Sequence, residues 1–260
     1  NLRLAYRQII DLLDEYALPA TFAFVGCFAE EKQALHRLIP ELQALGIKAS
    51  DYLSPAIEDI TNGSREGWHG AWAVEEVAHA STPHEIALHG VTHVPWTDLD
   101  RQGADLEMAL LAKMETPVRC ARTFVYPRNK IAHQGALLAS GIGGYRLSPP
   151  DRSRLSSLAS EFNIWSKPEV DPQLSDHSVP IPAGFFVNWQ AGPRRLVPDE
   201  ISLLRVRRLL DAAESNGEVV HYWLHPENLA TAPATMKLFR NIIKLVAERR
   251  NKGRCDVITQ

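Results

Sequence analysis

The stretch ATFAFVG at residues 20–26 is a short apolar run that lies between Pro19 and its own closing glycine. A run of this length, bounded by residues that favour turns, predicts a buried strand. In residues 2–16, just before it, apolar side chains recur with the period of an amphipathic helix. The chain therefore starts with a helix that leads into a buried strand, an order typical of α/β proteins.

The same alternation continues along the chain and predicts the fold class. Further strands are predicted at residues 84–88, 121–127, 143–147, 218–225 and 255–259, and helices at residues 30–45, 72–80, 105–114, 133–140, 199–216 and 234–250. Residues 47–72 and 148–182 are predicted to be irregular, with short elements in the second segment. We predict one α/β domain over residues 1–260, with a mainly parallel sheet that is either open or closed into a barrel.

The composition indicates an ordinary globular protein. Of 260 residues, 45% are hydrophobic and 23% are charged, and the formal net charge of −3 gives no reason to expect nucleic-acid binding. No apolar run is long enough for a membrane-spanning helix, and the start lacks the pattern of a secretion signal. Cys27, Cys120 and Cys255 are far apart and odd in number, so disulfides are not expected and a reducing cytoplasm is the expected compartment. Nothing in the sequence indicates an oligomeric state.

The motif HGVTH places His89 and His93 four positions apart, directly after the apolar run IAL. If the chain turned into a helix there, both imidazoles would lie on one face and could reach one cation. In parallel α/β folds, reactive side chains gather beyond the carboxyl ends of the strands, which favours a metal site over the alternatives of capping and surface histidines. Neutral imidazole suits zinc, iron, cobalt or nickel, and a third ligand such as a carboxylate is required.

A second group of polar residues follows two other predicted strands. His225 ends the run HYWLH, where it could donate a proton near the metal; the alternative is a core histidine bonded to a carbonyl. His221, deeper in that strand, is expected to be structural, and Trp223 shares the face of both histidines. Arg128 follows FVYP, where a guanidinium could orient a carboxylate or polarise a carbonyl, although a plain surface arginine is the alternative. We predict His225 as catalytic, and Arg128, Asn129 and Trp223 as substrate-binding.

In this order, LPATFAFVG, HGVTH, FVYPRN, GIGGYR and HYWLHPENL resemble the polysaccharide deacetylase family, the NodB-homology or carbohydrate esterase 4 class. The resemblance spans nearly the whole chain, from residue 20 to residue 259. It implies an irregular (β/α) barrel of about seven parallel strands. It also implies a divalent metal, zinc or else cobalt or nickel, held by one aspartate together with His89 and His93, and it makes His225 the catalytic histidine.

Two departures from the family pattern indicate a divergent branch. The family's first motif is an aspartate pair, one a general base and one a metal ligand, on a strand that precedes the first helix. We therefore expect the first strand, the third ligand and the base upstream of Asn1. The family's third motif has an arginine before its proline, whereas Val125 and Tyr126 precede Pro127 here and the arginine follows at 128.

The resemblance implies a metal-dependent hydrolase that removes N-acetyl groups from amino sugars of a bacterial polysaccharide or lipopolysaccharide. The alternative is a catalytically inactive saccharide-binding protein with the same fold, because the aspartate pair is missing. A serine hydrolase and a nucleotide enzyme are disfavoured, since the sequence contains no GxSxG, GxxxxGK[ST] or GxGxxG motif.

Overall fold

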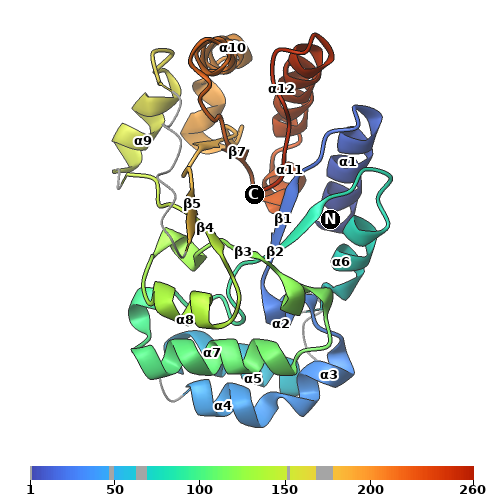
Figure 1. Cartoon of the computed structure of the whole chain (residues 1–260), viewed down its shortest axis with the longest axis vertical. Coiled ribbons are helices and arrows are strands. Elements are labelled where there is room, and N and C mark those ends of the chain that lie inside the picture. The colour runs from blue at the N-terminus through green and yellow to red at the C-terminus, as the bar shows by residue number, and fades with distance from the viewer. Residues whose placement is uncertain (1, 47–49, 63–68, 151–152, 168–177) are drawn as a thin grey trace.

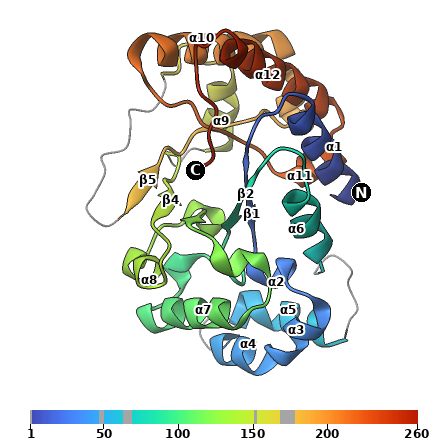
Figure 2. The same ribbon diagram turned by 45° about the vertical axis from the view of Figure 1, so that its right-hand side comes forward.

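The computed structural model describes residues 2–46, 50–62, 69–150, 153–167 and 178–260. Within this part, strands run through the middle of the molecule and helices surround them (Figure 1 and Figure 2). The described strands are β1 (Thr21–Phe24), β2 (Glu85–Leu88), β3 (Thr123–Phe124), β4 (Gly144–Arg146), β5 (Val179–Ile181), β6 (Phe185–Phe186) and β7 (Tyr222–Trp223).

The strands pair in the order in which they occur in the sequence. β1 to β5 form one sheet, and β6 and β7 form a second; every pairing is parallel. The longest pairing joins β1 to β2, with Thr21 opposite Glu85 and Phe24 opposite Leu88. The predicted α/β fold with a mainly parallel sheet is confirmed, and the carboxyl ends of its strands therefore meet at one edge.

A closed barrel of seven strands is not confirmed, because β5 and β6 do not pair in the described part of the chain. β5 hydrogen-bonds to β4 through the N–H of Val179 and the carbonyl of Ile181. The alternate residues, Pro180 and Pro182, face the opposite edge and have no N–H to donate. The two prolines thus make β5 an edge strand, and Gly184, with a φ of 73°, turns the chain into β6.

Helices cover the sheets at both ends of the molecule. The α-helices are α1 (Leu2–Glu15), α2 (Gly26–Ala29), α3 (Lys32–Arg37), α4 (Ile39–Gly46), α5 (Ser50–Asn62), α6 (Ala71–Ala78), α7 (Arg101–Lys113), α8 (Gln134–Ala139), α9 (Arg154–Glu161), α10 (Asp199–Asn216), α11 (Pro226–Thr231) and α12 (Ala234–Asn251). Short 3-10 turns are η2 (Trp96–Asp98), η3 (Pro117–Cys120), η4 (Pro127–Asn129) and η5 (Gly192–Leu196). In both views α4 and α7 lie at one end and α10 and α12 at the other (Figure 1 and Figure 2). None of the helices described is long and apolar enough to cross a membrane.

Side chains alternate between two faces of each strand, one packed on helices and one turned to the interior. On β1, Phe24 stacks on Tyr6 of α1, with ring centroids 5.9 Å apart. On the other face, Thr21 Oγ1 and Thr123 Oγ1 donate to the carboxylate of Glu85 at 2.7 and 2.6 Å. Every second residue lies on the same face of a strand, so the face that carries Glu85 continues to the polar groups beyond the carboxyl ends of the strands.

Three element predictions are wrong. The helix predicted at residues 30–45 is divided into α3 and α4, because Pro40 has no N–H with which to continue the pattern of α3. Residues 50–62, predicted to be irregular, form α5 although Pro55 lies inside it, and Ile60 of this helix is buried in the core. The neighbouring residues 47–49 and 63–68 lie outside the described part. Residues 255–259 form no strand, and Gln260 N–H instead donates to Thr21 Oγ1 at 2.9 Å.

Candidate functional site

The HGVTH loop follows β2 and is fixed by its neighbours. The N–H groups of Gly26 and Cys27 donate to the carbonyls of Gly90 and Val91 at 2.9 and 2.8 Å. Gly90 has a φ of 72°, and a Cβ at this position would lie 2.8 Å from Cγ of Pro127. Glycine is therefore required both for the backbone conformation and for the close approach of the η4 turn.

His89 and His93 lie next to each other at this loop. The helical turn predicted after Leu88 does not form, because Gly90 and His93 have positive φ values of 72° and 65°. The loop nevertheless brings the two imidazole rings to a centroid separation of 5.0 Å, with their planes inclined by 65°. At this separation two ring nitrogens can reach a common ion at the usual zinc–nitrogen distance of about 2.0–2.1 Å.

Burial keeps both rings in the neutral form that binds metals, and a hydrogen bond also fixes the ring of His89. His89 Nδ1 lies 2.7 Å from the carbonyl oxygen of Val125. Because a carbonyl only accepts, Nδ1 carries the proton and Nε2 keeps its lone pair. Burial lowers the pKa of His89 to about 3. Burial, and then the charge of Arg128, also lower the pKa of His93 below its ordinary value, so both rings are neutral near pH 7.

The pair fits two positions of a metal site. A metal-binding histidine usually donates its second ring N–H to a carbonyl or carboxylate, as His89 does to Val125. No group of three His, Cys, Asp or Glu side chains able to hold a metal ion occurs among the residues that the structure describes. His89 and His93 could therefore provide two ligands of such a site, and no described residue is assigned as the third.

A further histidine, His225, lies just beyond β7, at the start of α11. The charge of His225 acts on both His89 and His93, so the three imidazoles share one region. Half of the His225 side chain is exposed, and its Nδ1 lies 3.8 Å from Oε1 of Glu227. An exposed imidazole beside a carboxylate can carry a proton to or from a bound molecule. Glu227 was not singled out in the sequence, although it follows His225 by two positions at a strand exit.

Arg128 and Asn129 have left-handed backbone conformations, with φ values of 53° and 56°. Such conformations of residues other than glycine cost about 1–3 kcal/mol each and are found most often at functional sites. Asn129 is held by two hydrogen bonds: its Oδ1 accepts from Arg146 at 2.6 Å, and its carbonyl accepts from the Ser148 hydroxyl. The Arg128 side chain is exposed and its charge acts on His93. The η4 turn thus brings the charge of Arg128 near His93.

Arg146 also belongs to this region and was missed in the sequence. It ends β4 and is 8% exposed. Its guanidinium lies 4.6 Å from the ring centroid of Trp223, and that ring lies 5.4 Å from the ring of His225. Burial lowers the pKa of Arg146 to about 10. The sequence contained one indication of this role. Arg146 is a charged residue at the end of the strand GGYR, at a position that the alternation of side chains assigns to the interior face.

A buried carboxylate holds the HGVTH loop in place. Glu107 of α7 is fully buried and accepts hydrogen bonds from Val91 N at 3.3 Å, Thr92 N at 3.1 Å, Trp96 Nε1 at 2.9 Å and the Thr92 hydroxyl. Burial raises the pKa of Glu107, and these hydrogen bonds offset part of the rise. The sequence shows only that Glu107 shares a helical face with Ala104 and so points to the core.

Neither a family model nor a curated protein matches this chain. Among solved structures, the chain is similar to a crystal structure from Mycobacterium smegmatis described as a "putative polysaccharide deacetylase". The two share 17% sequence identity with a TM-score of 0.54, and the similarity covers 94% of this chain and 70% of the other. At this level of identity the similarity shows the fold alone.

Proposed function

We propose that this protein is a metal-dependent hydrolase that removes N-acetyl groups from amino sugars of a bacterial polysaccharide or lipopolysaccharide. The observation that carries the proposal is the clustering of His89, His93 and His225 just beyond the carboxyl ends of β2 and β7. The fold shared with the protein described as a polysaccharide deacetylase supports the choice of reaction. The clustering alone would fit other metal-assisted hydrolyses.

His89 and His93 would hold the divalent ion, zinc in the first place and cobalt or nickel otherwise, through their nitrogen lone pairs. When bound, such an ion supplies Lewis-acid polarisation of the amide carbonyl and a water of lowered pKa. The hydrogen bond from His89 Nδ1 to Val125 fixes the ring and leaves its Nε2 lone pair available. The third ligand and the general base are assigned to no described residue.

His225 would protonate the departing amine. An amine leaves poorly as an anion, so a proton must reach the nitrogen while the C–N bond breaks. The exposed position of His225 lets it meet a bound sugar, and Glu227 at 3.8 Å would stabilise the charged imidazolium before the transfer. The proposed proton donor thus follows β7, whereas the proposed metal ligands follow β2.

The saccharide itself would contact Trp223, Arg128 and Asn129. The indole of Trp223 offers an apolar face of the kind on which sugar rings stack. The exposed guanidinium of Arg128 carries several N–H donors for hydroxyl and carbonyl oxygens. The side-chain amide of Asn129 is held by Arg146 and so presents a fixed polar group.

The test is acetate release from N-acetylglucosamine oligomers. The protein, in the full length that its gene encodes, is dialysed against a chelator and then resupplied with zinc, cobalt or nickel. We expect release that requires the metal, and that falls about 10²- to 10⁴-fold in His225→Ala while metal content stays the same. If a broad panel of acetylated sugars binds but releases no acetate, the enzyme proposal fails and a saccharide-binding protein replaces it.

A further inference from the structure

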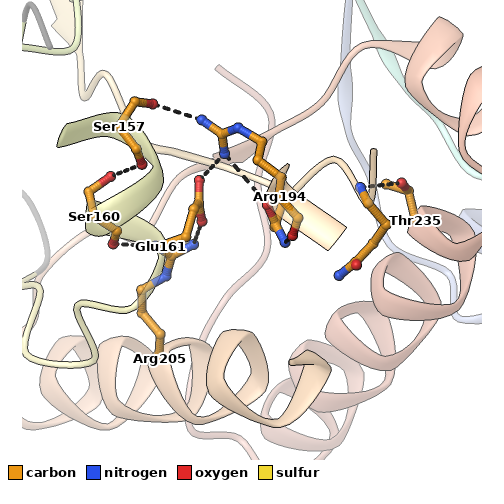
Figure 3. Close-up of polar contacts among 8 residues, drawn as sticks. Ser157, Ser160, Glu161, Arg194, Arg205 and Thr235 are labelled. Carbon is orange, nitrogen blue, oxygen red and sulfur yellow. Dashed lines mark hydrogen bonds and ion pairs between the residues drawn. The ribbon is translucent and has the colours of Figure 1, made fainter. Parts of the chain in front are cut away.

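The described part of the chain contains two buried arginines, and only one of them has an acidic partner. Arg205, which is 5% exposed, donates from Nη2 to Oε2 of Glu161 at 2.7 Å. Arg194 pairs with the same carboxylate, and Figure 3 shows the two arginines on either side of it. Ser157 and the carbonyl of Ser160 take further hydrogen bonds from these guanidinium groups. The charge of Arg205 is thus compensated inside the protein.

Arg146, which is 8% exposed, has no such compensation among the residues that the structure describes. The hydrogen bond described for it goes to the neutral Oδ1 of Asn129 at 2.6 Å, and the ring contact goes to Trp223. No acidic side chain in the described ranges forms an ion pair with Arg146 or offsets the effect of burial on its pKa. A buried charge without a counter-ion destabilises a protein, so the retention of one indicates that a charge is supplied from elsewhere.

Arg146 lies beside the residues of the proposed reaction. Its charge acts on both His89 and His221 and lowers their pKa values. Trp223, on which its guanidinium stacks, also contacts the ring of His225 at 5.4 Å between centroids. A negatively charged group bound at Arg146 would therefore belong to the same molecule that reaches the histidines.

We propose that Arg146, together with Asn129 and Trp223, binds a carboxylate of the substrate, so that the saccharide is an acidic one that contains uronic acid units. A single carboxylate balances one guanidinium charge for charge and matches its planar fork with two parallel N–H···O bonds. A phosphate monoester carries nearly two charges and is the poorer match for one arginine. The saccharide part of this inference rests on the proposed function, whereas the carboxylate part rests on Arg146, which has no acidic partner in the described part of the chain.

The first experiment measures binding and not hydrolysis. The probes are a hyaluronan hexasaccharide, which alternates glucuronate with N-acetylglucosamine, and the same oligomer with its carboxylates reduced to alcohols. By isothermal titration calorimetry at constant salt, we expect the acidic form to bind about 30-fold more tightly, equivalent to about 2 kcal/mol at 1.4 kcal/mol per factor of ten. In Arg146→Met the two forms should bind equally, while the exposed control Arg122→Met should keep the preference.

Two binding results would overturn the proposal. One is equal affinity of the unaltered protein for the acidic and reduced oligomers, and the other is an unchanged preference in Arg146→Met. A preference for N-acetylglucosamine 6-phosphate over the hyaluronan oligomer would likewise overturn the choice of a carboxylate. If acetate release fails but the preference for the acidic oligomer is found, the proposed function falls and the carboxylate site stands.

The second experiment compares the two buried arginines in the absence of ligand. We expect Arg146→Met to leave the urea midpoint unchanged or raised, because the substitution removes a buried charge that no acid in the described ranges balances. Arg205→Met should lower the midpoint clearly, because Glu161 then loses its buried partner and keeps only the partly exposed Arg194. If Arg146→Met unfolds the protein or lowers the midpoint as far as Arg205→Met does, Arg146 is a structural partner of a protein carboxylate and the proposal is wrong.

Discussion

Replacing Glu107 by alanine is expected to release the loop that carries His93. The carboxylate is fully buried and accepts from Val91 N, Thr92 N and Trp96 Nε1 at 3.3, 3.1 and 2.9 Å. Val91 and Trp96 are also fully buried, so their N–H groups cannot form hydrogen bonds to water instead. Each buried donor left unpaired costs about 1–3 kcal/mol, and entry of water into the vacated space lowers the sum. The expected loss in the free energy of unfolding is therefore about 3–5 kcal/mol.

Urea denaturation followed by tryptophan fluorescence measures this loss. The matched control is Asp105→Ala on the same helix, which breaks only an exposed ion pair with Arg101 and should change stability by no more than about 0.5 kcal/mol. Zinc affinity of Glu107→Ala should fall by about 10- to 100-fold, the usual effect of removing a group that holds a metal ligand in place. A loss in stability below about 1 kcal/mol, with zinc affinity unchanged, would refute the reasoning, because it would show that the loop keeps its shape without the carboxylate.

Three further outcomes are expected. Burial favours a higher pKa for Asp14, but hydrogen bonds from the N–H groups of residues 81–82 at 2.9 and 2.7 Å outweigh it and lower that pKa. The stability that Asp14 provides is therefore full above about pH 4 and lost as the pH falls through the lowered pKa, so the difference in unfolding free energy from Asp14→Asn should shrink in acid; a constant difference would contradict this. After dialysis, elemental analysis should find less zinc in a His89→Ala, His93→Ala double variant than in the unaltered protein, and equal content would exclude the pair as ligands. Arg128→Ala should weaken saccharide binding while stability changes by only about 0.5 kcal/mol in denaturant titration; a loss of several kcal/mol would make Arg128 structural.

Most of the fold could be predicted from local patterns in the sequence. The helix predicted at residues 199–216 forms with those bounds as α10, and Gly217, with a φ of 69°, ends it. The helix predicted at residues 234–250 forms as α12 with one additional residue. In both cases the helical period and the closing residues are read from adjacent positions, so no distant contact has to be known.

Closure of the sheets depends on distant contacts and could not be predicted in this way. The prolines at 180 and 182 remove N–H donors from one edge of β5, but only the pairing of its other edge with β4 shows which edge that is. Strand pairing joins residues far apart in the sequence, and composition does not encode the partner. The lack of pairing between β5 and β6 within the described ranges is therefore a finding of the structure.

The candidate site could likewise be predicted only where local sequence patterns determine it, and not where it depends on contacts between distant residues. The positions of His89, His93 and His225 at strand exits follow from the strand pattern, whereas the left-handed path that brings the first two together depends on contacts of Gly90 with Pro127. Arg146 and Glu107 carry charges that are ordinarily solvent-exposed. Their burial results from the elements packed around them, which spacing along the chain does not reveal.

Acetate release measured against metal occupancy is the most direct test of the proposed hydrolase. Metal-free protein is titrated with zinc in the presence of N-acetylated amino-sugar oligomers, and bound zinc and released acetate are measured on the same samples. The proposal predicts that release rises with bound zinc up to one equivalent, and that His89→Ala loses zinc and release together. Release that is insensitive to chelator and to His89→Ala, or saturated zinc and bound sugar without any release of acetate, would contradict it.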